Sequence, residues 1–475
     1  MRTLMWFRSD LRCQDNLALA HATSQSDGGV VGLFLYCPQQ WKQHDWGNPK
    51  VGFLHRNVQA LSEALRAYNI PLVIRVCESF QDATVHVLEV AQSLSCQTVM
   101  FNKEYEINER RRDKVVTEAL AQAGIAFQGF DDSVILEPGS VRKKDDTNYS
   151  VFTPYKKMWL QVLNLRGGPP SLAESQVQSV PVCDPSPLPD SIDGYDLSDD
   201  RADLWPAGEE QALERLEKFA AHRIHHYNDR RDIPSVNGTS TVSAYLALGV
   251  LSPRQCLSAA VRHANDSWPS LAMGKDGVSI WISELIWREF YRHLLVAYPR
   301  LSMDQPFQEK TKALVWRNNE EEFQAWCEGR TGYPIVDAAM QQLNQTGWMH
   351  NRLRMIVAMF LTKQLLVDWR WGERYFMQRL VDGDLAANNG GWQWSASTGT
   401  DAAPYFRIFN PWTQGKRFDP KGEFIKRLLP ELAEVPHTAL HDPVKLSSVK
   451  PASYPDPVCD HKEGRERALA AFKSL

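Results

Sequence analysis

The sequence predicts an α/β N-terminal domain with a doubly wound parallel sheet, followed by an acidic, proline-rich linker and an all-α C-terminal domain. Three observations carry this prediction. Short β-rich runs alternate with longer helical patterns over the first 130 residues, the composition changes at 171–210, and β-branched runs are missing from about 211 to 430. Alternating strands and helices are typical of a parallel sheet with helices on both faces. We therefore expect domains over 1–135 and 211–475, joined by a linker over 136–210.

The N-terminal elements follow from two hydrophobic periods. The predicted strands are the short β-rich runs at Thr3–Phe7, Val30–Tyr36, Leu72–Val76, Thr98–Phe101 and Ile125–Gly129. Helical patterns lie between most of them, at Gly52–Tyr68, Gln81–Ser93 and Glu106–Ala123. The predicted sheet is Rossmann-like, but its first strand runs into RSDLRCQDN and not into G-x-G-x-x-G. We therefore do not expect this domain to bind NAD.

Charge separates the linker from the rest of the chain. Residues 171–210 contain five prolines and ten acidic residues against one arginine, a net charge of −9. Since the whole chain carries −4, the remainder carries +5. Proline interrupts helices and like charges repel, so we expect an extended linker over the surface. The acidity of the chain is then a property of the linker and does not exclude a polyanionic partner.

Composition excludes several classes of protein. A hydrophobic content of 43% and a charged content of 23% are globular values, which excludes disordered and collagen-like chains. The longest uncharged apolar stretch, Val30–Cys37, is too short to cross a bilayer, and charges near the start predict no signal peptide. The eight cysteines include no C-x-x-C, so we expect reduced, mostly buried thiols in a cytosolic protein. His222 and His226 lack the glutamate of H-E-x-x-H, so we expect no metal site.

The segment SELIWREFYRHL (283–294) predicts a helix with an unusual stripe. Its i, i+3, i+4 and i+7 positions are Glu284, Trp287, Arg288 and Tyr291. Ordinary amphipathic helices bury Leu and Ile on such a stripe. A carboxylate, an indole, a guanidinium and a phenol instead suit a ligand with rings to stack on and phosphates to hold. The alternative is a half-buried tryptophan beneath a salt-bridged arginine.

The segment GWMHNRLRMIVAMFL (347–361) predicts a second functional helix. Asn351, Arg354 and Met355 share one face of it, and Arg352 lies off that face. An arginine that faces the interior needs a carboxylate partner, because an unpaired buried charge is very costly.

The loop DGDLAANNGGWQW (382–394) supplies carboxylates for such a pair, Asp382 and Asp384. Paired Asp and Asn with glycines are equally compatible with a plain surface turn. The loop leads straight into Trp392 and Trp394, however, whose large rings favour burial, so we prefer a functional interpretation.

Two further features concern phosphates. In YNDRRDIPSVNGTSTVSAYLALG (227–249), hydroxyls precede an apolar helix, which suits a pyrophosphate, although an N-cap is the commoner explanation. Residues 345–427 carry twelve Lys or Arg and seven Asp or Glu, compatible with a nucleic-acid footprint or with a solvated basic face. G-x-S-x-G and Walker motifs are absent, so the residues favour a redox or stacking ligand over hydrolysis.

At these residues the chain resembles the DNA photolyases of the cryptochrome/photolyase family, in the bacterial class I that repairs cyclobutane pyrimidine dimers. The resemblance covers nearly the whole chain, in the motifs WFRSDLRCQDNLAL (6–19), YEINERRRD (105–113), WRWGERYF (369–376) and DAAPYFRIFNP (401–411). It implies a carbon–carbon lyase in which light-driven electron transfer from reduced FAD splits the dimer. The spelling WMHNRLRM differs from the WIHHLARH of enzymes that repair six-four photoproducts.

The resemblance also implies how FAD is held, in a U-shape inside the helical domain. The residues implied for its phosphate side are Tyr227, Thr239, Ser240, Thr241, Val242 and Ser243. Those implied around the isoalloxazine are Asn351, Arg354, Asp382, Asp384 and Asn388. Arg354 would then pair with Asp382, and Asn388 would face the flavin N5. Thr241 departs from the arginine expected in close relatives.

Residues for the substrate and for electron transfer follow from the same resemblance. The dimer would be flipped out of the duplex. Glu284 would hydrogen-bond its carbonyls, Trp287 and Trp394 would pack on it, and Asn351, Met355 and Tyr291 would lie alongside. The candidates for flanking phosphates are Arg231, Arg288, Arg352, Arg407, Lys156 and Gln414. Trp392, Trp369 and Trp316 match the relay that reduces oxidised flavin from the surface.

An antenna chromophore is expected in the N-terminal domain. His44, Asn108 and Glu109 match positions that bind a reduced folate, so we expect methenyltetrahydrofolate and prefer it to a deazaflavin. Ser302 and Met303 stand where a Cys–Lys pair is expected, which weakens this expectation. We further expect a monomer in the cytoplasm, associated with the nucleoid through dimer-containing DNA, with no membrane or metal partner.

Three other functions are weighed against repair. A cryptochrome-type blue-light receptor would use the same flavin pocket but has no need of Glu284 with both Trp287 and Trp394. An electron-transfer flavoprotein would lack the basic rim and any light dependence. A purely structural nucleic-acid-binding module would bind DNA without holding flavin.

Overall fold

The computed structural model describes residues 1–198, 201–265, 267–268 and 274–475. The chain divides into two compact units. Unit 1 comprises Met1–His225, Ser240–Ser302 and Val381–Asp384, and unit 2 comprises His226–Thr239, Met303–Leu380 and Leu385–Leu475. The domain boundaries expected from the sequence, at 135 and 210, stay a prediction.

Unit 1 contains the predicted doubly wound sheet. Its five strands are parallel and lie in the order β3-β2-β1-β4-β5. Their bounds are β1 Thr3–Phe7, β2 Val30–Tyr36, β3 Leu72–Val76, β4 Thr98–Asn102 and β5 Ala126–Phe130. Strands β1, β2 and β4 are buried along their whole length, as expected for a parallel sheet covered on both faces. The strand predictions are confirmed to within one residue at each end.

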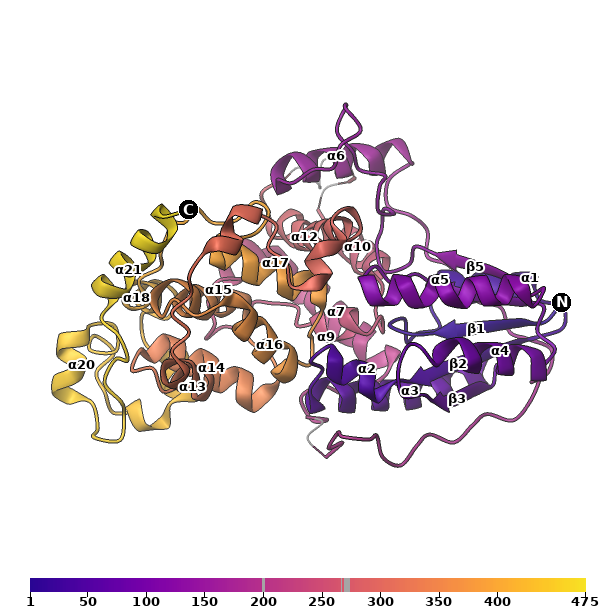
Figure 1. Ribbon diagram of the computed structural model, residues 1–475, viewed down its shortest axis with the longest axis horizontal. Coiled ribbons are helices and arrows are strands. Elements are labelled where there is room, and N and C mark those ends of the chain that lie inside the picture. The colour runs from indigo at the N-terminus through magenta and orange to yellow at the C-terminus, as the bar shows by residue number, and fades with distance from the viewer. Residues whose placement is uncertain (199–200, 266, 269–273) are drawn as a thin grey trace. The chain divides into compact units, whose positions relative to one another are not determined.

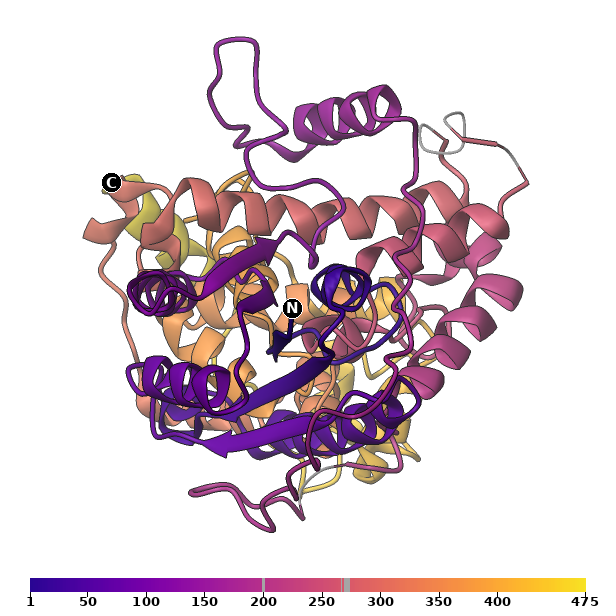
Figure 2. The same cartoon turned by 90° about the vertical axis from the view of Figure 1, so that its right-hand side faces the viewer.

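Helices cover both faces of this sheet (Figure 2). Helices α1 (Leu17–Gln25) and α3 (Asn48–Arg66) lie on one face, and α4 (Ala83–Ser93) and α5 (Ile107–Gln122) lie on the other. The sequence did not predict α1, whose Ala, Thr and Ser leave no clear apolar stripe, or the six-residue α2 (Pro38–Gln43). Helix α3 begins four residues earlier than expected, with Pro49 in its first turn, where a missing N–H costs little.

The acidic linker is extended, as expected. The described residues between 171 and 206 form no helix or strand. Backbone hydrogen bonds join this segment to the sheet domain, from Gln178 N to Tyr68 O (2.9 Å) and from Ser186 N to Leu72 O (2.9 Å). The expected linker also contains a helix before this point, α6 (Phe152–Leu165).

The remainder of the chain is helical, and no strand follows β5 in the described residues (Figure 1). Unit 1 adds α7 Glu209–His222, η1 Ile224–His226, α9 Ser243–Ala247, α10 Pro253–Arg262, α12 Gly277–Ala297 and the start of η2 Pro299–Met303. Unit 2 adds α8 Tyr227–Arg230, η3 Glu309–Ala313, α13 Glu320–Glu328, α14 Pro334–Thr346, α15 Asn351–Met359, the π-helical turn η4 Phe360–Gln364, α16 Trp369–Arg379, α17 Leu385–Ala396, α18 Pro411–Phe418, α19 Glu423–Leu428, η5 Pro430–Leu432, α20 Pro443–Val449 and α21 His461–Lys473. The expected loop over 382–394 is wrong for most of its length, because α17 begins at Leu385.

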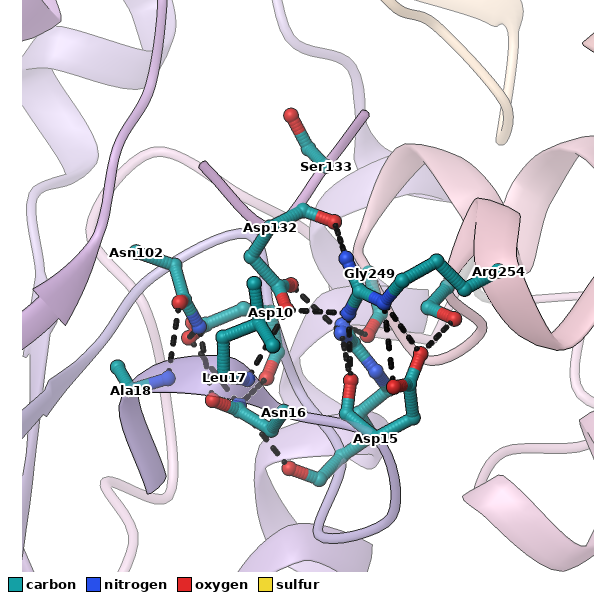
Figure 3. Close-up of polar contacts among 12 residues, drawn as sticks. Asp10, Asp15, Asn16, Leu17, Ala18, Asn102, Asp132, Ser133, Gly249 and Arg254 are labelled. Carbon is teal, nitrogen blue, oxygen red and sulfur yellow. Dashed lines mark hydrogen bonds and ion pairs between the residues drawn. The ribbon is translucent and has the colours of Figure 1, made fainter. Parts of the chain in front are cut away.

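A buried ionic network ties the carboxyl edge of the sheet to the helices of unit 1 (Figure 3). Arg254 on α10 lies 3.0 Å from Asp15 and 2.7 Å from Asp132, measured between nitrogen and carboxylate oxygen. Arg12 lies 2.6 Å from the other oxygen of Asp132 and donates to Gly249 O at 2.9 Å. Burial by itself raises the pKa of Asp132, but the two guanidinium groups hold it below its usual range. Each charge in the network therefore has an opposite charge beside it.

We predict that Arg254→Met lowers the free energy of unfolding by about 3–5 kcal/mol, because it leaves the buried carboxylate of Asp15 without its cation. Urea unfolding followed by circular dichroism measures this. The matched control is Arg262→Met on the same helix, where an exposed arginine pairs with Glu217 and the change should stay within about 0.5 kcal/mol. Equal losses in the two variants would contradict the importance of the buried network.

Candidate cofactor and substrate sites

The predicted stripe on α12 is present and half-buried. Glu284, Trp287, Arg288 and Tyr291 are partly accessible, whereas Leu285 and its other neighbours toward the core are buried. One half-buried face of this helix is therefore both polar and aromatic. In an ordinary amphipathic helix, the residues on such a stripe are apolar.

Two members of the stripe, Trp287 and Arg288, have a defined support in unit 1. The Trp287 ring stacks on Phe152 of α6, with centroids 3.6 Å apart and planes 9° apart. Arg288 donates to the carbonyls of Ser133 (2.6 Å) and Leu246 (3.1 Å), and burial lowers its pKa to about 9. Trp287 is therefore held against α6, and Arg288 is already engaged with backbone oxygens.

Lys156 also lies beside α12. Its Nζ donates to Ser283 Oγ at 2.6 Å. Burial lowers the pKa of Lys156, and the nearby Glu284 carboxylate opposes this shift. The ammonium group of Lys156 thus lies beside α12, near the carboxylate at the start of the stripe.

The hydroxyl-rich segment before α9 is held by an arginine that the sequence did not single out. Arg215 on α7 donates to Thr241 Oγ1 at 3.0 Å and to Leu204 O at 3.1 Å, and its guanidinium lies over Trp205 and Tyr245. Thr241 has a left-handed backbone, with φ of +53°. Arg215 lies 26 positions away, so no local motif marks it.

The N-cap explanation for this segment is not supported. Val242 occupies the N-cap of α9, and no side chain makes the capping hydrogen bond. Ser240, Thr241 and Ser243 are half-buried. In unit 2, Thr239 is half-buried and Tyr227 is buried, with the guanidinium of Arg231 5.6 Å from the Tyr227 ring centroid.

The second predicted helix is α15. Asn351 is exposed, and Arg354 and Met355 are half-buried. Arg354 Nε donates to Met349 O at 2.8 Å. Its expected pairing with Asp382 stays a prediction.

Arg352 is bound to a carboxylate from an earlier segment of unit 2. Its Nη2 and Nε donate to the two oxygens of Asp232, at 2.9 and 3.2 Å. Its guanidinium also lies 4.6 Å from the ring centroid of Phe418. Asp232 lies 120 positions away, and sequence reasoning did not find it.

The segment Val381–Asp384 belongs to unit 1, where two cations hold it. Arg292 on α12 pairs with the carboxylate of Asp384, and Lys50 on α3 donates to Gly383 O at 2.6 Å. Asp382 is buried, at 7% exposure. Neither Lys50 nor Arg292 was among the site residues predicted from the sequence.

Helix α17 fixes the orientation of the Asn388 amide. Asn388 Nδ2 donates to the backbone carbonyl of Glu373 on α16 at 3.0 Å. The neighbouring Asn389 Nδ2 donates to the side-chain carboxylate of Glu373 at 2.9 Å. One N–H of the Asn388 amide is used in this way, and its Oδ1 is an acceptor.

The three tryptophans expected as a relay share one core cluster in unit 2. Trp392 and Trp369 are buried, and Trp316 is partly buried at the edge of this cluster. The Trp392 ring lies edge-on to Phe376 at 5.0 Å and to Trp326 at 6.0 Å, between centroids. Trp326, fully buried, was not singled out in the sequence.

The segment after α17 presents exposed aromatic and basic groups. Lys363 Nζ donates to Ser397 Oγ (2.7 Å), which donates to Ala403 O (2.6 Å), while Ala403 N donates to Trp394 O (3.2 Å). Trp394 is half-buried, and Arg407 is exposed beyond this bonded stretch. Gln414 on α18 is half-buried.

The expected antenna residues come together in unit 1. His44 Nε2 lies 3.1 Å from Asn108 Nδ2, and His44 Nδ1 lies 3.5 Å from Glu109. Burial, helped by Lys50, lowers the pKa of His44 to about 4, so its ring is neutral near pH 7. Glu109 Oε2 is buried without a hydrogen-bond partner in the described structure, as is Ser302 Oγ.

A cavity adjoins this group at the carboxyl ends of β1, β2 and β4. Among its walls are the rings of Trp6, Trp41, Trp46 and Phe80 and the carboxylate of Glu109. The lining also includes the charged side chains of Arg8, Glu104 and Arg112, and aromatic walls beside such groups suit a planar ligand with polar edges. Met303, expected to help close the antenna site, is exposed.

Two absences concern the described residues only. None of their helices combines the length and apolarity that a membrane crossing requires. They also contain no group of three or more His, Cys, Asp or Glu arranged to hold a metal ion.

Comparisons with known proteins agree along the chain. A family model described as DNA photolyase matches residues 3–176, and one described as the FAD binding domain of DNA photolyase matches residues 281–474. A deoxyribodipyrimidine photo-lyase of Vibrio cholerae is 45% identical, over 99% of each chain. That of Escherichia coli is 47% identical, over 99% of this chain and 98% of its own. The structure of a bacterial class III photolyase from Agrobacterium tumefaciens matches with a TM-score of 0.86 and 34% identity, over 100% of this chain and 97% of its own.

We predict that Gly372→Ala destabilises unit 2 by about 1–3 kcal/mol, because a Cβ on this residue of α16 would overlap the Trp392 ring. The matched control is Gly391→Ala on α17, where a Cβ meets nothing and should stabilise the helix by about 0.5–1 kcal/mol. Urea unfolding followed by tryptophan fluorescence measures both. Two shifts of the same sign would contradict the close contact of Gly372 with Trp392.

Proposed function

Because the chain belongs to the DNA photolyase family, we infer that it splits cyclobutane pyrimidine dimers in DNA and restores the two pyrimidines, as a light-driven carbon–carbon lyase. The observation that carries this proposal is full-length similarity to relatives named deoxyribodipyrimidine photo-lyase. A blue-light receptor without repair activity is the alternative. The stripe of Glu284, Trp287 and Tyr291 on α12 favours repair, because a receptor has no substrate to bind there.

The residues present fit FAD by the chemistry of their donors. The hydroxyls of Thr239, Ser240, Thr241 and Ser243, together with Tyr227 and the backbone at Val242, are suited to its phosphates. The guanidinium of Arg354, the carboxylates of Asp382 and Asp384 and the amide of Asn351 are suited to the polar edge of the isoalloxazine. When bound and reduced, FAD supplies the electron that opens the cyclobutane ring and recovers it afterwards.

Asn388 is proposed to act on the flavin N5 through its carbonyl end. One N–H of its Nδ2 donates to Glu373 O, and Oδ1 is the acceptor proposed to face N5. An acceptor matches the N–H that reduced flavin carries at N5. The amide therefore favours the reduced form, which is the form that repair requires.

On the phosphate side, Arg215 compensates for the missing arginine at position 241. Its hydrogen bond to Thr241 Oγ1 fixes the segment in its left-handed conformation and brings a positive charge to it. A cation near a diphosphate is favourable in the partly buried setting of this segment.

The dimer is proposed to be flipped from the duplex onto α12. Glu284 hydrogen-bonds its carbonyls, Trp287 and Trp394 pack on its rings, and Asn351, Met355 and Tyr291 lie beside it. The proposed phosphate contacts are Arg231, Arg352, Arg407, Lys156 and Gln414. Arg288 differs from these, since its bonds to Ser133 O and Leu246 O suit a role in holding the stripe rather than in direct contact.

Three further parts of the proposal rest on sequence and geometry together. An electron path from the surface to the flavin is formed by Trp316, which is partly buried, and by Trp369 and Trp392, which are buried. His44, Asn108 and Glu109 bind methenyltetrahydrofolate as antenna. The protein acts as a monomer in the cytoplasm, associated with the nucleoid through damaged DNA, and uses no metal or membrane partner.

The test of the function is repair of an oligonucleotide with one thymine dimer by the reduced protein, under near-UV or blue light against a dark control. We expect intact thymines to reappear only in the light, while binding occurs in both. Flavin photoreduction with persisting dimers would establish the receptor alternative instead.

We predict that Glu284→Ala lowers repair per absorbed photon by roughly tenfold, as for the loss of one hydrogen bond to a charged group, while dimer binding is largely kept. The measurement is the quantum yield of repair at saturating oligonucleotide. Glu328→Ala, which removes a partly exposed carboxylate at the end of α13, is the control and should leave the yield unchanged. An unaltered yield in Glu284→Ala would remove this residue from the reaction.

We predict that Trp369→Phe abolishes most photoreduction of oxidised flavin, because phenylalanine is a much poorer electron donor in the middle of the path. Flavin absorbance under illumination with an external reductant measures this. Repair by protein reduced chemically beforehand should be normal and provides the internal control. Photoreduction at the original rate would show that electrons take another path.

A further inference from the structure

Lys50 is a charged side chain in the interior of unit 1. It lies in the first turns of α3 and is 3% exposed. Burial lowers its pKa to about 8, although the nearby carboxylates of Asp384 and Glu106 favour the charged form. An interior ammonium group is expensive, so what it contacts indicates why the site tolerates it.

The contacts of Lys50 join two functional regions. Its Nζ donates to Gly383 O at 2.6 Å, across 333 positions of sequence. The same Nζ lies 3.5 Å from the ring centroid of Trp46, which stacks on Trp41 with planes 8° apart. Both rings line the cavity beside the expected antenna residues. Lys50 therefore bonds the segment 382–384 directly to the wall of this cavity.

A second cation holds the same segment. Arg292 on α12 pairs with the Asp384 carboxylate, and its Nη1 is buried without a hydrogen-bond partner among the described atoms. The segment is only four residues long, Val381–Asp384, between the end of α16 and the start of α17. A backbone carbonyl held by Lys50 and a side chain held by Arg292 leave it little conformational freedom.

We propose that Lys50 is a positioning residue for FAD, which fixes the carboxylates of Asp382 and Asp384 by anchoring Gly383 to the cavity wall. The inference rests on the proposed placement of these carboxylates at the isoalloxazine. Lys50 itself touches neither the cofactor nor the reacting atoms. Its effect is to order the segment before FAD binds, so that binding does not have to restrict the segment's motion.

A positioning role and a merely structural role predict different results. The hydrogen bond of Lys50 goes to a backbone carbonyl, whereas Arg254 pairs with a carboxylate, and replacing Lys50 by an apolar side chain of similar length also removes the cost of burying its charge. Lys50→Met should therefore leave the sheet as stable as before while it releases the carbonyl of Gly383. A structural role would instead loosen α3 and the neighbouring strands.

The test compares Lys50→Met with Lys42→Met, an exposed lysine on α2 that pairs with Asp193. Dissociation of FAD from the holoprotein is followed by the rise of free-flavin fluorescence on dilution. Lys50→Met should release FAD about tenfold faster, as for the loss of one charge-assisted hydrogen bond, and Lys42→Met should match the unaltered chain. Amide hydrogen exchange of the holoprotein should rise over 380–388 in Lys50→Met and stay unchanged in β1 and β2.

Two results would overturn the inference: FAD release at the original rate, or faster exchange throughout the sheet together with faster release. Lys50→Gln removes the charge and places its amide nitrogen one bond short of the Nζ position, beyond hydrogen-bond distance of Gly383 O, so it decides the matter if the methionine variant does not fold. An original release rate in Lys50→Gln, with Lys50→Met unfolded, also overturns it. FAD release does not depend on repair, so failure of the proposed function in the dimer assay is recognised separately.

Discussion

The buried network of Arg12, Arg254, Asp15 and Asp132 is the constraint on which the rest of unit 1 depends. Asp15 and Asp132 follow strands of the sheet, and Arg254 comes from a helix more than a hundred residues later. Buried charges have low energy only when their partners are in place. The network therefore allows few arrangements of α10 against the sheet, and it fixes the chain just after α9, beside the hydroxyl-rich segment.

The same principle recurs at each candidate site. Three of the segments discussed above are short, and each is held by a cation from a distant element. Arg215 holds the segment at Thr241. Arg292 and Lys50 hold the segment at Asp384. Arg352 forms an ion pair with Asp232. Preorganised polar groups cost no reorganisation when a ligand or a transition state arrives. The cations thus fix the conformation of chain segments that contain little regular secondary structure.

In helix α12, side-chain packing decides between two interpretations of one sequence pattern. Its stripe of Glu284, Trp287, Arg288 and Tyr291 is compatible with a binding surface and with a tryptophan covered by an arginine. In the structure Trp287 lies on Phe152, and Arg288 is bonded to backbone carbonyls, so the arginine does not cover the indole through a salt bridge. Trp287 and Arg288 are therefore held by their own contacts, and the stripe stays half-buried and partly accessible.

The sequence by itself determined the five strands, the helices α3, α4, α5, α12 and α15, the extended linker and the family, because hydrophobic period, proline and motif spelling are local properties. It did not predict α1 or α2, which lack a long apolar stripe, and it placed a loop where α17 begins. Only the tertiary structure decided that Lys50 donates to Gly383 O, that Arg215 donates to Thr241 and that Asn388 donates to Glu373 O. These contacts join residues up to 333 positions apart, and no local pattern encodes which distant charge will be buried beside which carbonyl.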